Sequence, residues 1–296
     1  MDRLTGDEIA WAAQLACLFE VSVEKPGNVS PRIAFADMRF EDFAASAVAI
    51  GPALRDAGRA TVGETIARAA TDTRSLVAVN TNLGLILLLA PLATAAARPE
   101  SGGDLRGSLR NVLAALTARD ARLAFAAIRA AAPAGMGEVG QHDVREHDVG
   151  VTLRAAMDAA RERDSIAREY VTDFDITFTL GAETIRRCWQ DGARFSDAVL
   201  TAFLTLLAEI PDTLIARKNG AAAAEDVSRR AARVLAAGGA ASAEGRTRLD
   251  ALKRELGDRA HAMNPGTTAD LTAASLFIVL TEGGLLRQVP ALTARW

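Results

Sequence analysis

The chain has 296 residues, of which half are apolar and only 5% are aromatic. This length and apolar content suffice for one large domain or two small ones with a buried core. The net charge is −3 and no block of basic residues stands out, which argues against nucleic-acid binding. No cationic segment precedes an apolar stretch near the N-terminus, so we expect no signal peptide and a cytoplasmic protein.

Apolar residues recur at helical spacing along nearly the whole chain, and Ala and Leu dominate them. The first such segment begins near Ile9 and ends near Glu20. Further helices are predicted over residues 40–57, 62–79, 83–97, 104–117, 119–131, 150–165, 193–209, 222–237, 245–256 and 268–284. Residues 176–179 alternate as a short strand would, and they are the sole passable example. Because no Gly/Ser or Pro linker interrupts the pattern, the sequence predicts a single all-α domain over residues 1–296.

Two features bear on whether the chain crosses a membrane or contains a disulfide. The most apolar segment, residues 83–97, is shorter than the roughly 20 residues of a membrane span and contains Pro91, which favours a buried core helix and no membrane. Cys17 and Cys188 both lie in apolar helical patterns, which favours two reduced thiols over a disulfide.

The breaks between helices carry polar residues of particular types. In the first break, Glu20 is either a solvated residue at a helix end or part of a site, and a turn rich in Pro and Gly follows it. The second break places Asn80, Thr81 and Asn82 directly before the most apolar helix. Helix capping accounts for one of these three side chains, while a ligand-facing role is the alternative for the others.

A third break contains Gly135, Gly137 and Gly140 in the spacing of a dinucleotide-binding loop, but no strand precedes it, so that interpretation is rejected. His142 and His147 lie in the same loop without a third ligand at a recognisable spacing, which argues against zinc.

Two further breaks begin helices near the C-terminus. Asp212 is either a helix cap, with Gly220 closing the helix, or a site group. Thr267 and Asp270 have the spacing of a capping box, yet Gly266 before them also suits a turn that offers backbone N–H groups to phosphate. Polar breaks of this kind, each beside a buried helix, predict loops that converge on one cleft.

Four segments together resemble one known family. They are residues 20–29, with Lys-Pro-Gly-Asn, residues 80–84 (Asn-Thr-Asn-Leu-Gly), residues 211–218 (Pro-Asp-Thr-Leu-Ile-Ala-Arg-Lys) and residues 264–271 (Asn-Pro-Gly-Thr-Thr-Ala-Asp-Leu). In this order and spacing they are similar to the triphosphoribosyl-dephospho-CoA synthase family, in particular to its branch in methanogenic archaea and tetrahydromethanopterin-using bacteria.

The resemblance implies an all-α fold and an unusual use of ATP. Members transfer the triphosphoribosyl part of ATP to the ribose 2′-hydroxyl of dephospho-CoA and release adenine. We therefore expect ATP as substrate, Mg²⁺ as its companion, a small-molecule acceptor and a homodimer. Better-known members carry His-Lys where this chain has Asn82 and Leu83, and Gly-Ala-His where it has residues 34–36, so the acceptor can differ.

Residue roles follow from side-chain type and from position in the family's motifs. The expected catalytic carboxylates, as base or as stabiliser of positive charge on the ribose, are Glu20, Asp37 and Asp212. The expected Mg²⁺ ligands are Asp270, Asn80 and Asp143. The expected contacts to the nucleotide come from Lys25, Asn28, Asn80, Thr81, Asn82, Arg217, Lys218, Asn264, Gly266 and Thr267.

Two alternatives stay open at the level of the sequence. One is a Mg²⁺-dependent enzyme of one-carbon metabolism that acts on a nucleotide or a pterin-like cofactor by another reaction. The other is a nucleotide-binding protein without catalysis, because the His-Lys pair is replaced.

Overall fold

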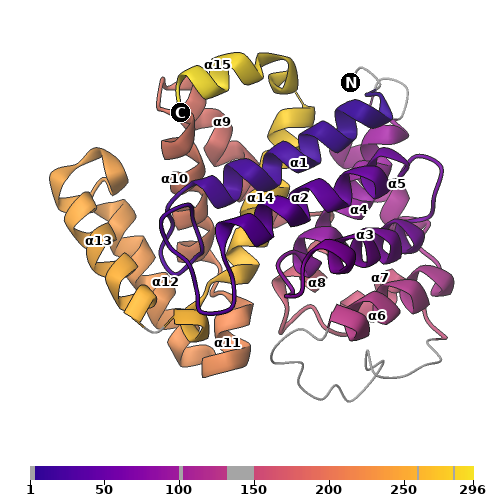
Figure 1. The fold of residues 1–296 in the computed structure, drawn as a ribbon, viewed down its shortest axis with the longest axis horizontal. Coiled ribbons are helices and arrows are strands. Elements are labelled where there is room, and N and C mark those ends of the chain that lie inside the picture. The colour runs from indigo at the N-terminus through magenta and orange to yellow at the C-terminus, as the bar shows by residue number, and fades with distance from the viewer. Residues whose placement is uncertain (1–3, 100–102, 132–149, 259, 283) are drawn as a thin grey trace.

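The computed structural model describes residues 4–99, 103–131, 150–258, 260–282 and 284–296. Within these residues the protein is built from helices and contains no strand, apart from one isolated bridge between Ser30 and Ile33 (Figure 1). The predicted all-α fold is therefore confirmed. Residues 135–140, His142, Asp143 and His147, which the sequence analysis considered, lie outside the described residues.

The N-terminal part of the described chain contains α1 (Gly6–Ser22), α2 (Phe40–Arg55), α3 (Val62–Leu76), α4 (Leu83–Ala97), α5 (Leu105–Ala114), α6 (Ala118–Ala131), α7 (Leu153–Asp158) and α8 (Ser165–Val171). The remaining part contains the π-helix η1 (Ile176–Ala182), α9 (Glu183–Gln190), α10 (Phe195–Glu209), α11 (Thr213–Asn219), α12 (Ala221–Ala236), the short turn η2 (Gly239–Ala241), α13 (Ala243–Asp258), η3 (Ala260–Met263), α14 (Gly266–Thr281), η4 (Leu285–Gln288) and α15 (Val289–Ala294).

Helix α14 lies near the centre of the molecule, behind α1 and α2 in the view of Figure 1. It packs against α1 from the other end of the chain, and against α4 and α10. Almost every residue of α4 and α14 is buried, as expected from their lack of a polar face. One continuous core extends from Ile9 to Leu292, while α12 and α13 form a hairpin at one side.

The predicted helix over residues 150–165 is wrong, because the chain breaks after Asp158. Asp164 begins a new helix: its carboxylate accepts hydrogen bonds from the N–H groups of Ile166 and Ala167 at 2.8 and 3.3 Å. An Asp followed by Ser is a favourable helix start, and this local signal outweighs the apolar periodicity that continues across it.

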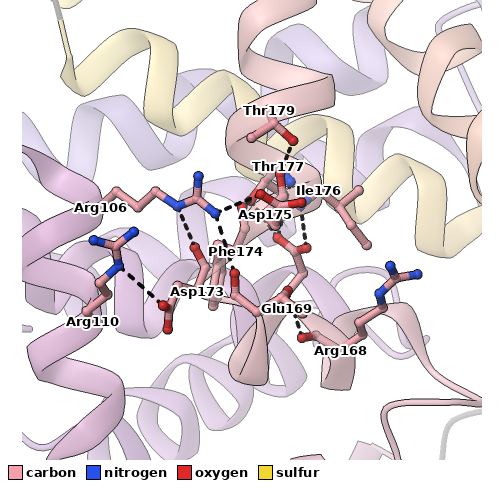
Figure 2. A network of polar contacts seen from close by, with 11 residues as sticks. Arg106, Arg110, Arg168, Glu169, Asp173, Phe174, Asp175, Ile176, Thr177 and Thr179 are labelled. Atoms are coloured by element: carbon pink, nitrogen blue, oxygen red, sulfur yellow. Dashed lines mark hydrogen bonds and ion pairs between the residues drawn. The ribbon is translucent and has the colours of Figure 1, made fainter.

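The strand-like residues 176–179 belong to the π-helix η1 (Figure 2). Asp173 and Phe174 adopt positive φ angles of 53° and 58° and turn the chain from α8 into η1. The fully buried Glu169 holds this turn, because its carboxylate accepts hydrogen bonds from the N–H groups of Ile176 and Thr177 and from the Thr177 hydroxyl. Burial raises the pKa of Glu169 to about 7.

Two side chains from other helices fix the same segment. Arg106 of α5 donates to the carbonyl of Asp173 at 3.1 Å and to the carboxylate of Asp175 at 2.8 Å (Figure 2). Ser275 of α14 donates to the carbonyl of Thr177. These bonds hold α8 and η1 in place beside α14, and α8 contributes to the pocket described below.

No single helix in the described ranges is both long and apolar enough to cross a bilayer, although two strongly bent helix pairs pass by length and composition.

Candidate active site

A pocket of about 700 Å³ is lined by residues from both the N-terminal and the C-terminal parts of the chain. Its walls come from α1, α2, α4, α6, α7, α8, α11 and α14 and from the loops around residues 28–38 and 78–82. A volume of this size is typical of ligand sites, which range over roughly 300–1,000 Å³. Most residues predicted from the sequence line it, namely Glu20, Asn28, Asp37, Asn80, Thr81, Asn82, Arg217, Lys218, Asn264, Gly266, Thr267 and Asp270.

The turn before Asn28 packs directly against the segment that begins α14. Gly27 has a φ angle of 72°, and a Cβ atom there would lie 2.9 Å from Pro265 and 3.1 Å from the carbonyl of Met263. Glycine is therefore required for both backbone conformation and space. As a result Asn28 donates a hydrogen bond of 2.8 Å to the Asn264 side chain, while its own buried Oδ1 has no partner within the described part of the chain.

The residues before α4 all find protein partners, yet all three line the pocket. The Asn80 side chain accepts from the N–H of Leu83 and so caps α4. Thr81 shares a 2.5 Å hydrogen bond with Ser46 of α2, and Asn82 donates to the Thr73 hydroxyl of α3 at 3.4 Å. This loop is thereby tied to three helices, which leaves its pocket-facing side rigid.

Gly84 is the second residue of α4 and lines the pocket where α4 approaches α14. A Cβ atom at this position would overlap the Asp270 carboxylate and would lie 2.7 Å from Ile166. The Asp270 carboxylate thus lies against the backbone of α4. Gly84 ends the Asn-Thr-Asn-Leu-Gly segment because only glycine leaves room for this side chain.

Asp212 does not face the pocket, contrary to its predicted catalytic role. It is 1% exposed, and one of its oxygens accepts from the N–H groups of Leu214 and Ile215, which begins α11. The other accepts from the N–H and hydroxyl of Thr268 at 2.7 and 2.8 Å, which begins α14. One buried carboxylate therefore caps two helices.

This arrangement also corrects the predicted capping box. The start of α14 has no side-chain cap from its own residues, and Asp212 supplies the cap instead. Asp270 faces the pocket, and the N–H of Thr267 meets no acceptor among the described residues, so α14 presents a donor at its positive end.

Lys25 likewise does not lie where a contact with phosphate was predicted. Its side chain is fully buried, and its ammonium lies 3.0 Å from a carboxylate oxygen of Glu20. The same ammonium donates to the carbonyls of Glu20 and Val23. Lys25 therefore lies behind Glu20 and orients the carboxylate that the pocket presents.

The pocket concentrates carboxylates around its middle. Burial raises the pKa of Glu20, an effect that the nearby Lys25 ammonium opposes. Burial, followed by the charge of Glu20, raises the pKa of Asp270 well above its usual range. Both shifts follow from placing negative groups close together where water is scarce.

Positive charge lies beside these carboxylates, on α11. Arg217 forms a 2.7 Å ion pair with Asp164, and Lys218 is half-buried, with burial lowering its pKa. Asp37 is exposed at the same side of the pocket and acts electrostatically on Lys218. An anionic ligand at the start of α14 would meet the Thr267 N–H together with these two cations.

The pocket residues that the sequence analysis did not single out include Cys17, Arg163 and Asp164. Cys17 was read as a core thiol, and it is indeed free and buried, but it also lines the pocket, where burial raises its pKa. Asp164 and Arg163 line the pocket from the turn before α8. The Asp-Ser start of α8 could have revealed Asp164, whereas nothing local marks Arg163.

No group of three or more His, Cys, Asp or Glu side chains in the described part of the chain is arranged to hold a metal ion. The carboxylates and amides around Asp270 could still contact a cation that arrives with a phosphorylated ligand. Mg²⁺ commonly uses one or two protein carboxylates together with substrate phosphates.

The fold and pocket define an all-helical protein in which a helix start and enclosed carboxylates line one pocket. The family model for ATP:dephospho-CoA triphosphoribosyl transferase matches residues 6–288. A Stutzerimonas stutzeri protein named "Probable 2-(5''-triphosphoribosyl)-3'-dephosphocoenzyme-A synthase" is 33% identical, over 86% of this chain and 84% of that protein. A Pseudomonas fluorescens protein of the same name is 28% identical, over 93% and 94%.

The fold itself also has a solved relative. A crystal structure from Archaeoglobus fulgidus, named as a candidate triphosphoribosyl-dephospho-CoA synthase, superposes with a TM-score of 0.63 and 30% identity. The match covers 81% of this chain and 98% of that one. The chain belongs to the ATP:dephospho-CoA triphosphoribosyl transferase family and is a transferase, which confirms the resemblance found in its motifs.

Proposed function

We propose that this protein transfers the triphosphoribosyl group of ATP to dephospho-CoA and releases adenine. The observation that carries the proposal is the single pocket in which a helix start with a free N–H adjoins enclosed carboxylates. The first feature suits a triphosphate, and the second suits a ribose carbon that develops positive charge. The names of the family and of the relatives give the donor and the acceptor.

In the proposed complex, the triphosphate lies at the start of α14, against the Thr267 N–H and the side chains of Arg217 and Lys218. The C1′–N9 bond of ATP breaks and its electron pair leaves with adenine. A new bond forms between C1′ and the acceptor's 2′-hydroxyl oxygen, and the hydroxyl proton is passed on, so that adenine departs protonated. Glu20, oriented by Lys25, stabilises the positive charge at C1′.

Asp270, with the amide side chains of Asn80 and Asn82, would hold Mg²⁺ bound to the triphosphate. When bound, the ion supplies neutralising charge to the phosphates. Asn28 and Asn264, joined by their hydrogen bond, offer further polar contacts at the same end. The exposed Asp37 is the second candidate base. A cytoplasmic location, a homodimer and the absence of nucleic-acid partners stay predictions.

The decisive experiment incubates the purified protein with Mg²⁺, ATP and dephospho-CoA and separates the bases and nucleotides by chromatography. We expect free adenine in equal amount to the new coenzyme derivative, and none when dephospho-CoA is omitted. Formation of ADP or phosphate instead would indicate a hydrolase or a phosphoryl transferase. Binding of ATP without any product would indicate a non-catalytic nucleotide-binding protein.

A further inference from the structure

The two ends of the pocket differ sharply in polarity, and α14 runs along the wall between them. Its pocket-lining residues are Gly266, Thr267 and Ala269 in the first turn, Asp270 in the second and Ala273 in the third. At 1.5 Å per residue, Asp270 lies about 6 Å and Ala273 about 10 Å along the helix from Gly266. The helix therefore leads from the anion-binding end, past the carboxylates, toward the interior.

The far end is built from apolar side chains of four helices. They are Leu87 of α4, Phe125 and Ile128 of α6, Met157 of α7 and Ile166 of α8, and each is at most 8% exposed. Phe125 and Ile128 lie three residues apart and so share one face of α6. None of the described pocket-lining residues within α6, α7 or α8 carries a charge.

The apolar end and the carboxylates approach each other at Gly84. A Cβ atom built there would overlap the Asp270 carboxylate and would lie 2.7 Å from Ile166. The carboxylate region and the apolar region of the pocket wall therefore meet at Gly84. A ligand long enough to span this junction must be charged at one end and apolar at the other.

We propose that the apolar end between α4, α6, α7 and α8 binds the adenine ring of the ATP donor. This inference rests on the proposed function. ATP carries its triphosphate on C5′ and its base on C1′, so a triphosphate at the start of α14 directs the base toward the far end. The ribose then lies at the middle of the pocket, beside Glu20 and Asp270. A flat aromatic ring suits the Phe125 and Met157 side chains.

The chief competitor for this end is the aliphatic pantetheine arm of dephospho-CoA. The direction of attack disfavours it, because an incoming hydroxyl must approach C1′ away from the departing base. The arm is also attached to the acceptor's diphosphate, which needs cationic partners; among the described residues beside the far end, only Arg163, in the turn between α7 and α8, brings a positive charge into the pocket. Adenine needs no such partner.

Two neighbouring alanines provide a matched test. Ala160 lines the pocket three residues after Met157, whereas Ala159 beside it is exposed to solvent and does not line the pocket. Ala160→Leu fills the far end, and Ala159→Leu adds the same atoms outside it. Calorimetry measures the Kd of ATP and of tripolyphosphate, both with Mg²⁺, for the wild type and each variant.

We expect Ala160→Leu to weaken ATP binding at least tenfold and to change tripolyphosphate binding less than twofold. Ala159→Leu should leave both unchanged. If Ala160→Leu proves unfolded by circular dichroism, Met157→Ala replaces it; the loss of contact should weaken ATP severalfold and again spare tripolyphosphate.

Several outcomes overturn the assignment. Unchanged ATP binding in the folded variant, equal weakening of ATP and tripolyphosphate, or a raised KM for dephospho-CoA alone would each place another group at the far end. In those cases the wild type still binds ATP and releases adenine, so only the assignment of the base fails. A wild type that binds neither ATP nor tripolyphosphate would refute the proposed function itself, and the adenine site with it.

Discussion

Asp212 and Asp270 are both aspartates that lie close to the beginning of α14, yet their surroundings differ in kind. Asp212 accepts four hydrogen bonds from protein donors, whereas the Asp270 carboxylate faces the pocket and accepts none from the residues that the structure describes. Burial raises the pKa of both carboxylates, but the hydrogen bonds to Asp212 oppose that effect, whereas the charges of Glu20 and Asp212 add to it at Asp270. The same substitution should therefore have opposite effects at the two positions.

Asp270→Asn should fold with equal or greater stability, by up to about 4 °C in Tm, and should lose about 100-fold or more of the adenine-releasing activity. The pKa of Asp270 is higher in the native state than in the unfolded state. The wild type therefore loses stability as the pH rises from the ordinary pKa of 3.8 through the native pKa. The advantage of the variant should therefore grow with pH. Thermal melts at several pH values and adenine assays measure both effects.

Asp212→Asn serves as the control with identical chemistry. The Asn side chain has one acceptor oxygen and can accept hydrogen bonds from only one of the two helix starts. We therefore expect the free energy of unfolding to fall by about 1–2 kcal/mol, measured as a lower urea midpoint. Any loss of activity should follow the unfolded fraction. If instead Asp270→Asn melts several degrees lower and stays active, Asp270 is structural and the pocket chemistry must centre on Glu20.

At the scale of elements, the close approach of α4 to α14 depends on Gly84. Gly84→Ala should reduce activity at least tenfold, because the added methyl group overlaps the Asp270 carboxylate and displaces it. Helix propensity alone would favour Ala by about 1 kcal/mol, so a pure propensity effect predicts higher stability and full activity. Kinetic assays together with melting curves separate the two effects.

Gly257→Ala in α13 is the matched helical control, since a Cβ atom there meets nothing within 4 Å. It should raise stability slightly and leave activity unchanged. An active Gly84→Ala variant would show that Asp270 can move without consequence, and would contradict the importance of its position.

At the scale of the whole molecule, helices from the first and last parts of the chain share one core. α1 and α14 pack together, and the main apolar cluster includes residues from Ile9 to Leu292. The prediction of a single domain over residues 1–296 therefore has a direct test. Urea unfolding followed by far-UV circular dichroism and by fluorescence of Trp189 and Trp296 should give coincident single transitions. Two separate transitions would indicate two domains.

The sequence by itself determined the helical class, most helix positions and the segments that meet at the pocket. Residues 83–97 were predicted with the bounds that α4 has, because Asn82 before it and uninterrupted apolar residues within it are local signals. The family motifs were equally local, since glycine, proline and amide side chains mark turns whatever surrounds them. The helix break after Asp158 was missed although the Asp164 helix start is a local signal, because apolar periodicity continues across it. The π-helix was missed because hydrogen bonds from Glu169 and Arg106 stabilise it from outside the segment.

Only the tertiary structure decided which polar residue does what. Lys25 and Asp212 belong to the same motifs as Asn28 and Arg217. Nothing in the sequence distinguishes the residues that face the pocket from those that stabilise the fold. Packing turned Lys25 behind Glu20 and enclosed Asp212 between two helix starts, while it left Asp270 facing the pocket. The apolar far end is likewise assembled from four helices whose residues read individually as core. A side chain's role depends on the partners that folding places within a few ångströms of it, and those partners come from distant parts of the chain.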